Sequence, residues 1–122
     1  MKWGLRLGGI LMLTATTIPS SAGEPLRMKV SPAVSFAPAF VRVQTTIELN
    51  AYNRAVEITA QSEDFYRSST IPLEGDQAAR TNIFEFPSLP QGTYVVTATL
   101  FGSDGRPRGR VRQTLNVVSR GH

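Results

Sequence analysis

The sequence contains no cysteine and a single histidine, His122, at the end of the chain. The absence of cysteine excludes disulfide bonds, thiolate metal ligands and a thiol nucleophile. One histidine at the chain end excludes a histidine-based catalytic triad, and a metal site built from several histidines, within the fold. The sequence therefore predicts no catalytic residue, no cofactor-binding residue, no metal ligand and no cofactor.

A hydrophobic run long enough to span a membrane is also absent, because the apolar stretch near the N-terminus, residues 7–18, covers only 12 residues. A membrane-spanning helix needs about 20 such residues. The positively charged residues Lys2 and Arg6 precede this stretch, and small residues follow it up to Ala22. This pattern is typical of a secretory signal peptide. We predict a signal peptide over residues 1–22, cleaved after Ala22, in preference to an uncleaved membrane anchor.

The excess of positive charge is small once the predicted signal peptide is removed. The whole chain has 13 basic and 9 acidic residues, and loss of Lys2 and Arg6 leaves 11 basic against 9 acidic ones, a net charge of +2. Nucleic-acid binding proteins usually carry a clear basic excess, so nucleic acid is not a predicted partner. An exported chain without cysteine is typical of the bacterial periplasm or of a protein secreted by bacteria.

Alternating apolar and polar residues dominate the rest of the chain, with turn residues every eight to twelve positions. This spacing is typical of an all-β sandwich or barrel. We predict one β-domain over residues 23–118, followed by a polar tail over residues 119–122. About seven strands are expected, over residues 28–30, 40–49, 55–62, 65–73, 82–86, 92–101 and 110–118, with one helical turn within residues 74–80.

Residues 89–96, with the sequence LPQGTYVV, resemble the corner between two strands of an immunoglobulin-like or fibronectin-III-like β-sandwich. In such domains a tyrosine folds its hydroxyl back onto the upstream backbone. Tyr94 matches that tyrosine, while Leu89 and Gly92 match the buried residue and the tight turn before it. The resemblance implies an immunoglobulin-like fold of the bacterial type, because Val96 stands where antibody-type domains have a cysteine.

Four arginines recur at every second position near the C-terminus: Arg106, Arg108, Arg110 and Arg112. On an extended strand this spacing places them on one face, about 7 Å apart. Guanidinium groups bind phosphates and carboxylates in a bidentate manner, so the four arginines are a candidate binding site. The alternative is a solvated strand face, where charge also prevents edge-to-edge pairing.

Tyr66 and Arg67 form a second candidate contact site. Adjacent residues on a strand face opposite directions, so one of Phe65 and Tyr66 is expected in the core and the other in solvent. An exposed tyrosine beside an arginine is a common contact hot spot in interfaces. The alternative is an isolated surface tyrosine with no partner, which is common in proteins.

These features predict an exported, non-enzymatic module of the cell envelope that binds another protein or an acidic polymer. The alternative is a structural or assembly subunit that pairs with a partner by strand addition through its proline-interrupted first strand. An enzyme is the third possibility. The sequence does not indicate an oligomeric state.

Export makes a first testable prediction. The intact mass of the exported protein is expected to correspond to a chain that begins at Gly23, because small residues precede this position. A mature protein that retains residues 1–22 would instead identify the apolar stretch as an anchor.

Overall fold

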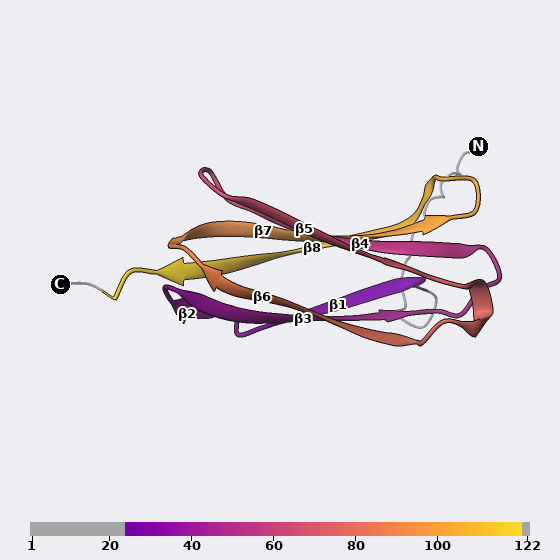
Figure 1. Cartoon of the computed structure of the whole chain (residues 1–122), viewed down its shortest axis with the longest axis horizontal. Helices are drawn as coiled ribbons and strands as arrows, with labels where there is room; N and C mark the ends of the chain where they lie inside the picture. Colours follow the sequence, from indigo (N-terminus) through magenta and orange to yellow (C-terminus); the bar gives the residue numbers. More distant parts are fainter. Residues whose placement is uncertain (1–23, 121–122) are drawn as a thin grey trace, which may run out of the picture.

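The computed structural model of the chain describes residues 24–120 (Figure 1). The predicted signal peptide and His122 lie outside this range. Among the described residues, no helix has the length and apolar character needed to cross a membrane.

Eight β-strands and one short 3-10 turn make up the described chain. Their bounds agree with the seven expected strands to within a few residues, apart from one additional short strand. The elements are β1 (Leu26–Ser31), β2 (Val34–Phe36), β3 (Ala39–Ile47), β4 (Asn53–Gln61), β5 (Tyr66–Pro72), η3 (Gly75–Gln77), β6 (Thr81–Leu89), β7 (Gly92–Gly102) and β8 (Pro107–Val118).

The strands form two sheets that lie one above the other (Figure 1). The three-stranded sheet has the order β1-β3-β6, and all of its pairs are antiparallel. The five-stranded sheet has the order β2-β8-β7-β4-β5, in which β2 pairs with β8 in parallel and the other pairs are antiparallel. The chain is therefore an all-β domain, as predicted.

The core lies between the two sheets and follows directly from the alternating pattern. Side chains of opposite faces alternate along a strand, so every second residue of each strand points inward. The alternating apolar residues of β3 and β4 are buried. The main core side chains are Val41, Val43 and Ile47 of β3, Val56 and Ile58 of β4, Phe84 and Phe86 of β6, Tyr94, Val96 and Leu100 of β7, and Leu115 and Val117 of β8.

The additional strand is β2, which the sequence pattern presented only as a broken edge segment. Two prolines, Pro32 and Pro38, flank it and follow cis peptide bonds. Proline has no N–H to donate to a sheet, so the chain leaves the three-stranded sheet here. It then pairs with the last strand of the other sheet, where the N–H of Ala37 donates to the carbonyl of Val118 at 2.8 Å.

Three connections gather at one end of the sandwich: the β3–β4 loop, η3 and the β7–β8 turn (Figure 1). Gly75 of η3 has a positive φ of 62°, and a Cβ at this position would lie 2.9 Å from the carbonyl oxygen of Ala51. Only glycine allows this approach. The β3–β4 loop is therefore packed closely against η3.

Tyr94 of β7 stabilises the opposite end of the sandwich. Its side chain is fully buried, and its hydroxyl donates to the carbonyl oxygen of Pro90 at 2.6 Å. The ring meets Phe65 edge to face, with 6.2 Å between the ring centroids. Burial raises the pKa of the Tyr94 hydroxyl, and a hydrogen bond with Ser62 and the charge of Arg67 oppose this rise.

Substitution of Tyr94 tests its contribution to folding. Tyr94→Phe is expected to lower the free energy of unfolding by about 1 kcal/mol through one lost hydrogen bond. Tyr94→Ala is expected to cost about 3 kcal/mol or more, because it also leaves a cavity. Urea denaturation measures both changes, and equal, negligible losses would contradict this account of the corner.

The raised pKa adds a second readout for the same residue. The folded chain holds the Tyr94 proton more tightly than the unfolded chain, whose tyrosine pKa is near 10.0. The resulting stabilisation is complete below this pH and is lost as the pH rises through the higher pKa of the folded state. Tyr94→Phe should reduce this alkaline loss, measured as the fall in the free energy of unfolding between neutral and alkaline pH, and an unchanged fall would contradict the raised pKa.

Candidate functional site

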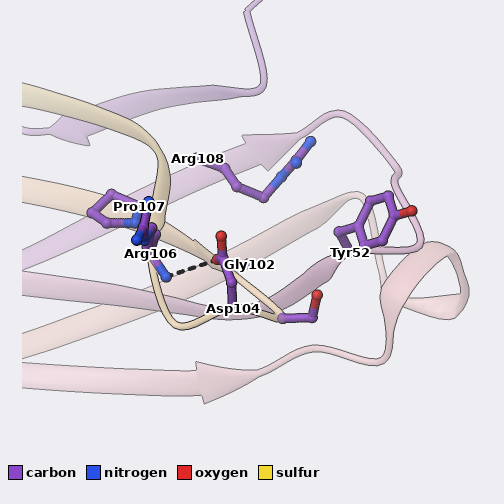
Figure 2. Close-up of a pocket in the computed structure, with 7 residues that line it drawn as sticks. Tyr52, Gly102, Asp104, Arg106, Pro107 and Arg108 are labelled. Atoms are coloured by element: carbon purple, nitrogen blue, oxygen red, sulfur yellow. Dashed lines mark hydrogen bonds between the residues drawn. The ribbon is translucent and has the colours of Figure 1, made fainter.

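The β7–β8 turn is a tight hairpin that positions Arg106. The N–H of Gly102 donates to the carbonyl of Arg106 at 2.9 Å, and Gly105 takes a positive φ of 80°. Asp104 Oδ1 accepts the backbone N–H of Arg106 at 2.9 Å (Figure 2). Asp104 and glycine favour such a turn because the short carboxylate binds the backbone and glycine accepts a positive φ.

A β-bulge follows directly and changes the direction of Arg108. Leu100 pairs with Gly109, but Phe101 pairs with Pro107, so Arg108 is the extra residue. Bulges of this kind redirect a side chain away from the regular alternation of the strand. Gly102 leaves room for the arginine, since a Cβ on Gly102 would lie 2.9 Å from Cδ of Arg108.

Asn53 of β4 holds the redirected arginine. Its side chain is completely buried. Its Nδ2 donates to the carbonyl of Glu48 at 3.0 Å, and its Oδ1 accepts from Nε of Arg108 at 3.2 Å. Because the amide uses both of its polar atoms, it connects the β3–β4 loop to β8. Figure 2 shows the Arg108 side chain extended from β8 toward the loop that carries Tyr52.

These contacts border a cavity of about 490 Å³ at this end of the sandwich. Tyr52 is 62% exposed on its wall. No carboxylate of residues 24–120 lies within 4.0 Å of a side-chain nitrogen of Arg106 or Arg108, since the ion pair of this part of the chain joins Arg42 and Glu85. We call this cavity the end pocket; it is lined by Tyr52, Gly102, Ser103, Asp104, Arg106, Pro107 and Arg108.

The four arginines expected on one strand face are therefore divided between two places. Arg106 lies in the turn before β8 and Arg108 is turned by the bulge, so both line the end pocket. Arg110 and Arg112 remain on the outer face of the five-stranded sheet, where Nε of Arg110 donates to Oγ1 of Thr99 at 3.4 Å. The expectation of one continuous face fails because the period-2 rule assumes a strand without a bulge.

Tyr66 and Arg67 do not form a common surface. Tyr66 is 59% exposed, whereas Phe65 packs against the core, so one aromatic is inside and the other outside. Nη1 of Arg67 donates to the carbonyl of Pro87 at 3.0 Å, and its guanidinium lies 5.2 Å from the centre of the Phe65 ring. Arg67 therefore links β5 of one sheet to β6 of the other.

Two residues of the end pocket region, Tyr52 and Asn53, were not identified from the sequence as site residues. They belong to a short segment whose pattern indicates only a turn between two strands. Asn53 is 55 positions from Arg108 along the chain, so no local spacing pattern connects them. The one sequence feature that could have indicated this loop is the pair of asparagines, Asn50 and Asn53, because asparagine side chains commonly stabilise loops.

Comparison with known protein families and with curated proteins found no match. Among solved structures, the chain is similar to a superoxide reductase (neelaredoxin) from Ignicoccus hospitalis, with a TM-score of 0.61, 14% identity and coverage of 77% of this chain and 80% of that one. A second structure, of a variant form of that protein, gives a TM-score of 0.62 at the same identity and coverage. A family 76 glycoside hydrolase from a bovine Bacteroides thetaiotaomicron strain matches 78% of this chain, but only 20% of its own, with a TM-score of 0.55 and 19% identity.

Two predictions made from the sequence are wrong on these findings. The family resemblance drawn from residues 89–96 is overturned, because the structures matched over most of both chains are superoxide reductases and no immunoglobulin-like or fibronectin-III-like domain was found. The prediction that the chain is a non-enzymatic module is overturned because the shared fold is that of an enzyme. At 14% identity the likeness shows the fold and assigns no reaction to this chain.

The described residues do not fit a redox metal centre. Reduction of superoxide is an electron transfer, which needs a redox-active group, and proteins bind such metals through histidine, cysteine and carboxylate side chains. Residues 24–120 contain neither histidine nor cysteine. Within the same range, no three metal-ligating side chains of these kinds lie close enough together to hold an ion. No redox step follows from this part of the chain.

The contact between Asn53 and Arg108 is testable by a double-mutant cycle. Asn53→Ala is expected to lower the free energy of unfolding by about 1 to 3 kcal/mol, because buried polar groups lose their partners. Arg108→Ala should be coupled to it by at least about 0.5 kcal/mol, as is usual for residues in direct contact. Arg110→Ala, on the sheet's outer face, should add independently. Additive losses for Asn53 and Arg108 would contradict the proposed link.

Proposed function

We propose that this chain binds a small oxyanion in the end pocket, between Arg106 and Arg108. The observation that carries the proposal is that two arginines, Arg106 and Arg108, line one cavity, and that no carboxylate of the described residues lies within ion-pair distance of either. Guanidinium groups bind the oxygens of phosphates and carboxylates through paired, charge-assisted hydrogen bonds. The pocket lining carries two arginines against one carboxylate, that of Asp104, so its formal charge is positive.

The arrangement of Arg108 supports binding as well. Nε of Arg108 donates a hydrogen bond to Oδ1 of Asn53 at 3.2 Å. This bond restrains the long arginine side chain before any ligand binds. Restraint of this kind lowers the entropy lost on binding. The two terminal nitrogens of the guanidinium make no hydrogen bond to residues 24–120. They remain available for the two oxygens of a bound anion.

The matched structures give a further, weaker reason for a small ligand. The superoxide reductases with this fold are named for superoxide, which is itself a small oxygen anion. The ligand proposed for this chain has the negative charge and the small size of superoxide, and the proposal includes no electron transfer. The predicted signal peptide supports binding outside the cytoplasm, in the periplasm or in the medium.

Titration with inorganic phosphate at low ionic strength tests the proposal by calorimetry. Arg106→Gln is expected to weaken binding by about 10- to 100-fold, because a hydrogen bond to a charged group contributes about 1.5 to 3 kcal/mol. This variant should fold normally, since the Arg106 side chain is exposed and makes no hydrogen bond within residues 24–120.

Arg112→Gln is the matched control. It removes the same charge from the outer face of the five-stranded sheet and should leave phosphate binding almost unchanged. Arg108→Lys should weaken binding, because lysine keeps the charge but loses the planar fork. Equal losses in Arg106→Gln and Arg112→Gln would show attraction by overall charge and would overturn the site.

A further inference from the structure

The end pocket is much larger than a bare oxyanion needs. Its volume of about 490 Å³ is within the range of cavities that hold small organic ligands. Phosphate or superoxide would contact the two arginines and leave most of the lining without a partner. The other residues of the lining therefore indicate the remainder of the ligand.

Tyr52 supplies a flat apolar surface in this lining. Its backbone N–H donates to Oδ1 of Asn50 at 2.8 Å. Arg54 donates from Nη1 to the carbonyl of the neighbouring Ala51 at 2.6 Å, and Gly75 packs against the same residue. The loop is thus held from several sides, while 62% of Tyr52 stays exposed. An exposed aromatic ring on a held loop beside charged groups suits a ligand with an apolar face and a polar rim.

Asp104 supplies an acceptor next to the arginines. One of its oxygens, Oδ1, accepts the N–H of Arg106 at 2.9 Å. The carboxylate would repel a simple anion, but it can accept hydrogen bonds from hydroxyl groups. Ser103, in the same turn, adds a hydroxyl that can donate or accept. A ligand that benefits from this side of the pocket carries hydroxyl groups in addition to its negative charge.

We propose that the end pocket binds an anionic monosaccharide, a sugar that carries a phosphate or a carboxylate. Its acidic group lies between Arg106 and Arg108, its ring lies on Tyr52, and its hydroxyl groups donate to Asp104. This inference rests on the proposed oxyanion site, and it adds the chemical class of the ligand. The three features required, positive charge, an apolar ring face and a hydroxyl acceptor, meet in one cavity.

Calorimetry tests the class of ligand with two bare anions, inorganic phosphate and acetate, and two anionic sugars, glucose 6-phosphate and glucuronate. Neutral glucose and adenosine monophosphate are the controls. At least one of the two sugars is expected to bind about tenfold more tightly than its bare anion, phosphate or acetate, because it gains ring stacking and hydroxyl contacts. The sugar with the larger gain identifies phosphate or carboxylate as the acidic group. Neutral glucose should bind far more weakly than either sugar.

Variants of Tyr52 and Asp104 separate the ring contact from the anion contact. Tyr52→Ala should weaken sugar binding about five- to tenfold and leave phosphate binding unchanged, while Tyr52→Phe should keep both. Tyr66→Ala, at an exposed tyrosine of β5, is the matched control and should change neither. Asp104→Asn should reduce the preference for the sugar over phosphate, since loss of the negative charge favours both anions while loss of a carboxylate acceptor weakens only the hydroxyl contacts of the sugar.

The measured affinities distinguish failure of the sugar assignment from failure of the oxyanion site. Sugars that bind no more tightly than the bare anions would overturn the inference and leave the oxyanion site intact. Tighter binding of adenosine monophosphate than of both sugars would assign a nucleotide instead and would also overturn it. Glucose binding as tightly as glucose 6-phosphate, or the absence of binding by every probe, would overturn the oxyanion site itself.

Discussion

The buried amide of Asn53 is the contact on which the end pocket depends. Its two polar atoms join the carbonyl of Glu48 to Nε of Arg108, and its backbone N–H donates to Asn50 at 3.1 Å. A buried amide is costly unless it is fully hydrogen bonded, so this set of partners has little freedom to change. The position of Arg108, the shape of the β3–β4 loop and the place of Tyr52 all follow from it.

The sandwich beneath the pocket provides the rigidity that this arrangement needs. Tightly packed apolar side chains from both sheets fill the core, and Tyr94 fastens the opposite end through its bond to Pro90. Arg67 joins the sheets at their β5 and β6 edges. A ligand site gains most when the elements around it do not move, because little order is then lost on binding. The loops of the pocket are short and are tied to the strands.

The chain shares its fold with an enzyme but does not share the means for electron transfer within the described residues. The superoxide reductase fold is recognisable in the path of the strands at 14% identity. A fold positions side chains without determining which side chains they are, so the same sandwich supports different chemistry. In this chain the functional groups gathered at one end are arginine, aspartate and tyrosine. We propose that these groups bind a ligand.

The sequence by itself determined the all-β class, most of the strands and the inner face of each central strand, because alternation of apolar residues is a local property that burial enforces. It indicated Arg106 and Arg108 as binding candidates, and it did not indicate Tyr52 or Asn53 as their neighbours. Only the tertiary structure decided that a bulge at Arg108 divides the arginines and that Asn53, 55 residues away, receives one of them. A bulge and a contact between distant strands depend on how the sheets pair and pack, which period-2 spacing along the chain does not encode.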